Sequence, residues 1–401
     1  MGIKSRWVLV ALAVAPIIVW NSCIGSNSAP SNTSFMWVAT QGDQKVRSYT
    51  IRQTNGTIAA IGSDGSPVAT DVQPTAMIIA PDGKTMFIVN AGGTVTAYTV
   101  NSNGTLAAAG SGVNTNGENP VALAIDPAGK FLFVANQGTS GDVTSGTIAV
   151  FAVSGTNLNL VSTFPTELLS DVGGSGPSAV AVSPVGSYLY VANQFSNNVE
   201  EFTFDAAGAL TLKNSYTAGI NPTGLAFSRC AGVASNTATA TCTVADDNNL
   251  FVSNSGSNNI SIFSACIQIT ATCGAPDGRL AEIPSGSPVA AGVGPSTILI
   301  NRGANFVYVV DRGSSQVSGY QYSPATGILS SLSTASGGAS VFSGGITANL
   351  ANNTTTFNWV VVTNNGSSSL SLLQVQSTGK LITSTSGQFA VQGQPSAILL
   401  R

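Results

Sequence analysis

The sequence predicts an all-β fold, a seven-bladed β-propeller with four antiparallel strands in each blade. Three observations support this prediction. Four types of short segment, rich in β-branched and aromatic residues, each recur seven times along the 401 residues. Gly, Pro, Asn or Ser bound the segments, as is usual for strands. No long amphipathic helix is apparent, and seven units of four strands are typical of a propeller.

The first two segment types define the repeat. The first follows an anchor residue, usually Pro, and occurs as "PTAMII" at Pro74, "PVALAI" at Pro120, "PSAVAV" at Pro177, "PTGLAF" at Pro222, "PSTILI" at Pro295, "GITANL" at Gly345 and "PSAILL" at Pro395. The second is aromatic and apolar and ends in a polar residue; it occurs as "WVAT" at Trp37, "FIVN" at Phe87, "FVAN" at Phe133, "YVAN" at Tyr190, "FVSN" at Phe251, "YVVD" at Tyr308 and "VVTN" at Val361.

The third and fourth segment types complete each blade. The third begins at Val46, Val95, Ile148, Val199, Ile260, Val317 and Leu370, and the fourth begins near Gly56, Gly104, Thr156, Gly208, Gly278, Gly327 and Gly379. In an up-and-down blade, the loops after strands two and four share one face, here called the first face. The loops after strands one and three share the opposite, second face. The long stretches at residues 138–146 and 162–176 are therefore predicted to lie on the first face.

The order of the segments predicts how the ring closes. The chain enters at Phe35 in a strand of the second type and leaves through residues 395–401 in a strand of the first type. One blade is therefore built from both ends of the chain. Pairing the two ends hides an edge that would otherwise stay open. Residues 35–401 are predicted to form a single propeller.

The N-terminus predicts export. Lys4 and Arg6 precede an apolar run of 14 residues, from Trp7 to Trp20, which is the size of a signal-peptide core. The following "WNSC" resembles a bacterial lipobox in its Ser22–Cys23 pair, although Trp20 and Asn21 depart from the usual pattern. We expect residues 1–23 to be a signal peptide and residues 24–34 a polar tether. Lipidation of Cys23 is favoured, with plain cleavage or an uncleaved anchor as the alternatives, and it predicts a bacterial envelope protein that meets the membrane through this lipid only.

The remaining cysteines predict disulfides. Cys230, Cys242, Cys266 and Cys273 are an even number in an exported chain. Local pairing, Cys230 with Cys242 and Cys266 with Cys273, is the simplest connectivity, and crossed pairing stays open. Both pairs are predicted on the second face. The spacing is wrong for zinc and the chain has no His, so neither a metal nor a cofactor is predicted.

The polar residues that end the second segments are candidate ligand-binding residues. They are Thr40, Asn90, Asn136, Asn193, Asn254, Asp311 and Asn364. One reading is that they cap turns by bonding their own backbone. The other is that the five asparagines form an exposed rim that binds a neutral sugar, a glycan or an envelope protein. Glu118, next to the Pro120 anchor, is predicted to line the same entrance.

The ring has a charged exception. Asp311 stands where five segments have Asn, and Arg312 follows it. A base and an oxyanion donor are what lactone hydrolysis requires, so the two are candidate catalytic residues, with a salt bridge as the alternative. Arg47, Glu200 and Glu201, in strands of the third type, are expected to be structural. The chain holds only 14 basic residues, which argues against nucleic acid as a partner.

The "YVAN" and "FVAN" segments and the run "DPAGKFLFVAN", Asp126 to Asn136, resemble the YVTN-type repeats of the seven-bladed lactonase-like superfamily. The resemblance spans Phe35 to Arg401. It implies a propeller and either sugar-lactone hydrolysis, as in bacterial 6-phosphogluconolactonases, or the cycloisomerase chemistry of fungal relatives, through Arg, Glu and often His. Related repeats also occur in surface-layer and adhesion proteins. None of the catalytic positions is matched residue by residue.

Two functions follow from these observations. The favoured expectation is a membrane-anchored propeller that binds a carbohydrate or an envelope protein and hydrolyses lactones weakly or not at all. The alternative is a lactonase-like hydrolase of sugar lactones.

Overall fold

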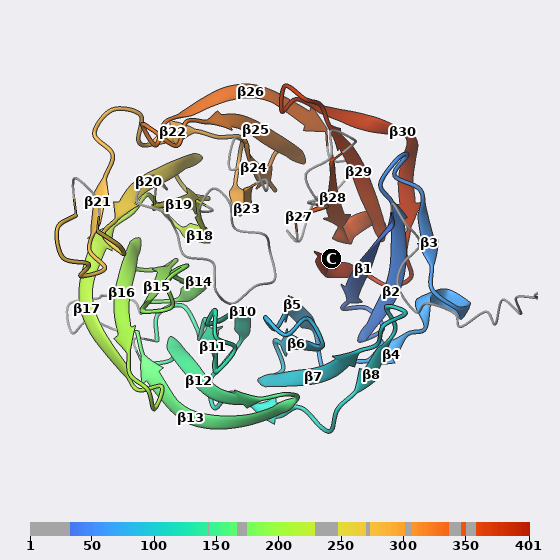
Figure 1. The fold of residues 1–401 in the computed structure, drawn as a ribbon, viewed down its shortest axis with the longest axis horizontal. Helices are drawn as coiled ribbons and strands as arrows, with labels where there is room; N and C mark the ends of the chain where they lie inside the picture. The colour runs from blue at the N-terminus through green and yellow to red at the C-terminus, as the bar shows by residue number, and fades with distance from the viewer. Residues whose placement is uncertain are drawn as a thin grey trace, which may run out of the picture.

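The computed structural model describes residues 33–142, 144–166, 175–228, 248–269, 273–300, 306–336, 346–349 and 358–401. These residues form seven antiparallel sheets placed around a central axis (Figure 1). The predicted seven-bladed propeller is confirmed. Among the described residues, no helix has the length and hydropathy needed to cross a membrane.

The first three blades are built as follows. Blade 1 contains β31 (Pro395–Leu400), β1 (Thr33–Thr40), β2 (Lys45–Arg52), β3 (Ile58–Ala60), the 3-10 turn η1 (Ser63–Gly65) and β4 (Val68–Ala69). Blade 2 contains β5 (Pro74–Ile79), β6 (Thr85–Asn90), β7 (Thr94–Val100), β8 (Leu106–Ala108) and β9 (Val113–Asn114). Blade 3 contains β10 (Pro120–Ile125), β11 (Phe131–Asn136), β12 (Thr147–Ser154) and β13 (Asn157–Pro165).

The other four blades follow the same order. Blade 4 contains β14 (Pro177–Val182), β15 (Tyr188–Asn193), β16 (Asn198–Phe204) and β17 (Leu210–Thr217). Blade 5 contains β18 (Pro222–Phe227), β19 (Asn249–Asn254), β20 (Asn259–Ala265), β21 (Leu280–Glu282) and β22 (Val289–Ala290). Blade 6 contains β23 (Pro295–Ile300), β24 (Phe306–Asp311), β25 (Gln316–Tyr322) and β26 (Leu329–Ser336). Blade 7 contains β27 (Ile346–Asn349), β28 (Asn358–Asn364), the 3-10 turn η2 (Asn365–Ser367), β29 (Ser369–Val375) and β30 (Leu381–Ala390).

The fourth strand is broken in three blades, which the repeat did not predict. In blades 1, 2 and 5 it consists of two short strands that both pair with the third strand. The breaks fall at residues 62–66, 110–112 and 284–288, which are runs of Gly, Ser, Asp and Pro. Gly and Pro weaken or interrupt a β-ladder, so these runs leave the outer edge of a blade in two pieces.

Closure through both chain ends is confirmed. β1 pairs with β31 in an antiparallel register that joins Met36 to Leu400 and Thr40 to Pro395. Phe35 and Arg401 exchange both backbone hydrogen bonds. β1 begins at Thr33, two residues before the predicted start of the propeller, because Thr33 still pairs with Arg52 of β2.

The apolar second strands fill the spaces between blades. Successive residues of a strand point to opposite faces of its sheet. In β6, Met86 and Ile88 pack toward blade 1, whereas Phe87 and Val89 pack toward blade 3. All six residues of β6 are buried. Seven such clusters, one at each blade interface, make up the core, which explains why these strands are apolar throughout instead of alternating.

The longer loops confirm the predicted faces where they are described. Gly146, at the end of the first of these stretches, lies beside the end of β13 on the first face, where the backbone N–H of Thr166 donates to Gly146 O at 3.1 Å. The Cys266–Cys273 disulfide is confirmed, with Cα atoms 5.3 Å apart, in the loop after β20 on the second face. Cys230 and Cys242 lie outside the described residues, as do Cys23 and the predicted signal peptide.

Candidate functional site

The first strand of every blade lies closest to the central axis (Figure 1). Each of these strands is at the end of its sheet order, so its inner edge faces the channel without a neighbouring strand. A cavity of about 570 Å³ occupies the channel. Small residues two places after the anchor line it, namely Ala76, Ala122, Ala179, Gly224, Thr297 and Ala397. Small side chains leave both the cavity and the polar backbone edges accessible.

Hydroxyl groups tie neighbouring first strands together around this wall. The residue after the anchor donates to the carbonyl of the next blade's anchor in four blades. These bonds are Thr75 Oγ1 to Pro120 O at 3.0 Å, Ser178 Oγ to Pro222 O at 2.6 Å, Thr223 Oγ1 to Pro295 O at 2.8 Å and Ser396 Oγ to Pro74 O at 2.5 Å. We call this set the hydroxyl belt. It satisfies anchor carbonyls and fixes the spacing of the blades at the cavity.

A repeated backbone hydrogen bond between two loops builds the end of the channel that opens on the first face. This end is here called the mouth. In blades 2 to 6, the residue after the buried polar residue donates its N–H to the carbonyl of the residue before an anchor. The bonds join Ala91 to Gln73, Gln137 to Asn119, Gln194 to Gly176, Ser255 to Asn221 and Arg312 to Gly294, at 2.8–3.0 Å. The accepting residues have φ between 50° and 65°, a conformation that Gly and Asn adopt most readily. We call each such pair of loops a mouth bracket.

The mouth brackets decide which side chains face the cavity. Gln41, Gln137, Gln194 and Arg312 line it, and each directly follows one of the polar residues singled out in the sequence. Those polar residues, Thr40, Asn90, Asn136, Asn193, Asn254, Asp311 and Asn364, have no exposed surface. The predicted exposed rim is therefore displaced by one residue, because side chains alternate along a strand. Ligand binding by the five asparagines stays a prediction, although it assumed that their side chains are exposed and the structure shows them buried.

The buried asparagines hold the second and third strands together. Asn136 Nδ2 donates to Thr147 Oγ1 at 3.0 Å, and Asn193 Nδ2 donates to Asn198 Oδ1 at 2.9 Å. The amides of Asn254 and Asn364 donate to Ser261 and Ser371, at 3.0 and 2.8 Å. These partners lie across the turn, on the next strand, and not on the backbone one or two residues on. For these four asparagines the turn-capping reading was right in placing the amides at a turn and wrong about their partners. Asn90 differs, because its Nδ2 also donates to the backbone carbonyls of Ile88 and Thr94, at 3.3 and 3.4 Å.

Asp311 and Arg312 face different surroundings. Asp311 Oδ2 accepts from Ser318 Oγ at 2.5 Å and from the backbone N–H of Gly292. Burial raises the pKa of the Asp311 carboxyl to about 6, against the opposing effect of hydrogen bonds from the Ser318 hydroxyl and from the backbone N–H groups of Gly292 and Ser318. Arg312 instead lines the cavity. The two predicted catalytic groups are thus not brought to one surface, and their catalytic role stays a prediction.

Arg312 is the charged group among the described residues that line the cavity. Its side chain reaches solvent, yet the surrounding protein displaces enough water to lower the pKa of its guanidinium. A side chain in a concave channel can touch solvent and still lose part of its hydration. A guanidinium remains protonated in proteins, so Arg312 presents a fixed positive charge and several N–H donors to the cavity.

Amide groups occupy the opposite side of the mouth. Gln137 Nε2 donates to Gln194 Oε1 at 3.2 Å, and Asn119 Nδ2 donates to Gln137 Oε1 at 3.0 Å. Gln137 and Gln194 belong to blades 3 and 4, and Arg312 belongs to blade 6. A ligand in the cavity therefore meets an amide pair on one side and a guanidinium on the other. The sequence analysis did not predict Gln41, Gln137 and Gln194. Side chains alternate along a strand, so the residue after each buried polar residue could have been expected to face the cavity.

Glu118 lies on the first face but does not line the cavity. Its side chain is exposed, and its Oε2 accepts from Thr139 Oγ1 at 3.2 Å. Its carbonyl accepts from the N–H of Gly138 in the mouth bracket of blade 3. Its predicted contact with a ligand stays a prediction.

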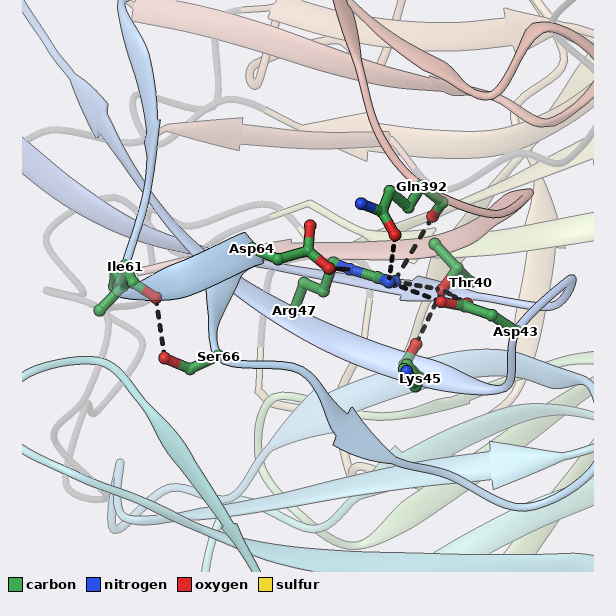
Figure 2. Close-up of polar contacts among 8 residues, drawn as sticks. All are labelled: Thr40, Asp43, Lys45, Arg47, Ile61, Asp64, Ser66 and Gln392. Atoms are coloured by element: carbon green, nitrogen blue, oxygen red, sulfur yellow. Dashed lines mark hydrogen bonds and ion pairs between the residues drawn. The ribbon is translucent and has the colours of Figure 1, made fainter.

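Arg47 is a structural residue, as expected from the sequence. Figure 2 shows its guanidinium between Asp43, Asp64, Thr40 and Gln392. The distances to Asp43 and Asp64 are 2.6 and 3.3 Å, and Arg47 is 1% exposed. Gln392 precedes β31, so Arg47 joins the two chain ends of blade 1. Glu201 is likewise buried, and it accepts from Tyr216 Oη at 2.7 Å and from Asn214 Nδ2 at 2.9 Å.

Comparison with known proteins agrees with this architecture. The family model "Lactonase, 7-bladed beta-propeller" matches residues 31–154, 147–268 and 269–395. A periplasmic gluconolactonase of Pseudomonas aeruginosa superposes with a TM-score of 0.72 at 20% identity, over 92% of this chain and 99% of that one. A Bacteroides fragilis protein, provisionally described as a 6-phosphogluconolactonase, gives 0.70 at 18%, over 93% and 99%. At these identities the likeness shows the fold. No curated protein matches the chain.

Proposed function

Because the chain belongs to the lactonase family of seven-bladed β-propellers, we propose that it binds and hydrolyses a lactone at the mouth of its central channel. The observation that carries this proposal is the convergence of Arg312 and three glutamines on one cavity of about 570 Å³. This volume falls within the range of small-molecule pockets. The resemblance to a gluconolactonase supports a sugar lactone as the type of substrate.

Arg312 is the group that would promote the reaction. In lactone hydrolysis the water oxygen bonds to the carbonyl carbon, the ring C–O bond breaks, and a water proton passes to the leaving alkoxide. Negative charge builds on the carbonyl oxygen before the ring opens. A guanidinium held at a partly desolvated position stabilises such a charge more than water does. The Gln137–Gln194 pair would hold the hydroxyl groups of the ring across the cavity.

Arg312 also provides the direct test. We expect the purified protein to hydrolyse glucono-δ-lactone faster than the spontaneous reaction, and Arg312→Gln to lose about 10²- to 10³-fold in kcat, the usual effect of removing one oxyanion donor. Arg279→Gln is the matched control, because Arg279 is exposed on the second face beside Asp277. Wild-type turnover no faster than the spontaneous rate would reject hydrolysis.

Binding without turnover is the second candidate function. It is favoured by one observation: the described residues that line the cavity include no carboxylate, and the chain has no His. The ligand would then be a neutral sugar, a glycan or an envelope protein. Calorimetry with gluconate and with short glycans distinguishes the two candidates, because a binding module retains affinity when turnover is absent.

We also propose export and lipid anchoring through Cys23. The charged and apolar pattern of residues 4–20 supports export, and the gluconolactonase of similar fold is described as periplasmic. Intact-mass analysis of the membrane fraction is expected to show a diacylglyceryl adduct on a chain that begins at Cys23. An unmodified N-terminus would contradict the anchor and leave export to be judged by fractionation.

A further inference from the structure

Exposed aliphatic side chains recur at one position of the mouth brackets. Val72, Ile220 and Val293 each lie two residues before an anchor Pro, and they are 51%, 56% and 55% exposed. In the part of the chain that the structure describes, only one other large aliphatic side chain, Ile269, is more than half exposed. Isolated exposed aliphatic residues are ordinary. Three at the same position around the mouth form a pattern.

Val293 belongs to the same mouth bracket as Arg312. Its carbonyl accepts from the N–H of Gly313 at 2.8 Å, while the carbonyl of Gly294 accepts from the N–H of Arg312. A Cβ placed on Gly313 would lie 2.7 Å from Val293 Cγ1, so a glycine is needed there for the valine to pack closely. The aliphatic side chain is therefore fixed beside the cation.

Ile220 lies in the mouth bracket of the neighbouring blade. Its carbonyl accepts from the N–H of Gly256 at 2.9 Å. Asn258, in the same turn as Gly256, accepts from the N–H of Gly294 at 2.8 Å. These bonds link the bracket of blade 5 to that of blade 6. Ile220 and Val293 are thus on adjacent, connected loops next to Arg312.

The opposite part of the mouth is polar. In blade 3 the position two before the anchor is Glu118, and in blade 4 it is Ser175, which is 1% exposed. These brackets carry the Gln137–Gln194 pair. The mouth therefore has a polar side, formed by blades 3 and 4, and a side that combines a cation with exposed aliphatic groups, formed by blades 5 and 6.

We infer that the mouth accepts a lactone that carries an aliphatic substituent, with the carbonyl oxygen at Arg312 and the substituent over Ile220 and Val293. This inference rests on the proposed function and specifies its substrate class. A carbonyl at Arg312 places the rest of the ligand within reach of the two side chains in the linked brackets. Covering them removes apolar surface from water, which favours binding in proportion to the area covered.

A series with one ring and a growing chain tests the inference. We expect kcat/KM to rise from γ-butyrolactone through γ-octalactone to γ-decalactone, by about two- to fourfold for each methylene that is covered. Ile220→Ser and Val293→Ser should flatten this dependence. Val72→Ser is the matched control, since Val72 has the same position and exposure on blade 2, and it should leave the dependence unchanged. All three positions are exposed, so melting temperatures should hold.

Binding of the γ-lactams with the same chains, measured by calorimetry, separates this inference from the proposed function. Lactams resist hydrolysis, so their affinity reports on the mouth alone. Absent lactone turnover, together with lactam affinity that rises with chain length and falls in Ile220→Ser, would reject hydrolysis and keep the aliphatic site. Affinity independent of chain length, no lactam binding, or an equal effect of Val72→Ser would overturn the inference whatever the turnover.

Discussion

A single step along a strand separates a structural residue from a site residue in this protein. Asn136 is buried and bonded to Thr147, whereas Gln137 lines the cavity. The same holds for Asp311 and Arg312. A polar group that is buried needs a partner of its own, so it is constrained to few residue types. The next residue varies more, being Gln, Ala, Ser, Arg or Asn in different blades, and in four blades it lines the cavity.

Asp311→Asn tests whether the buried carboxyl lowers the stability of the folded protein at neutral pH. Asn254 shows the expected arrangement, since its amide donates to Ser261 Oγ and accepts from Gly219 N–H. The pKa of Asp311 is raised to about 6 in the folded state. A raised carboxyl pKa favours folding at low pH, and this contribution is lost as pH rises from about 4 through 6.

We therefore expect Asp311→Asn to gain about 1 to 3 kcal/mol in the free energy of unfolding between pH 4 and pH 8, relative to wild type. Urea unfolding at the two pH values measures it. Asn254→Asp is the reciprocal variant and should lose stability over the same range. A wild-type-like pH dependence in Asp311→Asn would show that the carboxyl is not protonated in the folded protein.

At the scale of elements, the first strands act through their edges. In most sheets an exposed edge invites pairing with another chain. Here six of the seven first strands line the cavity, and the hydroxyl belt uses side chains to satisfy anchor carbonyls between blades. The belt is interrupted at blade 3, where Val121 replaces the hydroxyl residue, and at blade 6, where Ser296 Oγ donates to Val310 O of its own blade.

Thr223→Val measures one bond of the belt. Val keeps the shape of Thr and removes the donor to Pro295 O. We expect a loss of about 1 kcal/mol in the free energy of unfolding, the usual net value of one hydrogen bond. Thr50→Val is the control, because the Thr50 hydroxyl lies 3.5 Å from Ala59 O at an exposed position. Equal effects of the two substitutions would mean that the belt contributes nothing of its own.

The blades were predictable from the sequence, and the mouth was not. The second strands, such as β11 and β15, are recognisable because burial on both sides requires an apolar residue at every position. Mouth brackets join residues 18 to 34 positions apart through backbone atoms, as in Gln137 with Asn119 and Ser255 with Asn221. Backbone bonds leave little trace in side-chain type. Arg312 was identified because its charge is unusual, whereas Gln41, Gln137 and Gln194 are common surface residues in a chain rich in polar uncharged side chains.

For the whole molecule, closure depends on one terminal strand. β31 pairs with β1 and buries Ala397 and Ile398 between blades 1, 2 and 7. Removing residues 395–401 should expose the edge of β1 and cost several kcal/mol, on the order of one strand's buried apolar surface. Thermal unfolding and sedimentation should show a lower melting temperature and self-association. Ser396→Ala, which removes only a belt bond, should cost far less; a truncated chain that melts like wild type would refute the role of closure.

The direction of β1 sets how the propeller can stand on a surface. β1 runs from Thr33 on the second face to Thr40 at the mouth, so the described chain begins on the face opposite the mouth. The ten residues from Cys23 to Thr33 reach at most about 35 Å. A lipid on Cys23 would hold the second face toward the membrane, with the mouth turned toward the surrounding solution. Water-borne compounds could then enter without passing between protein and bilayer, whereas material still embedded in the bilayer could not.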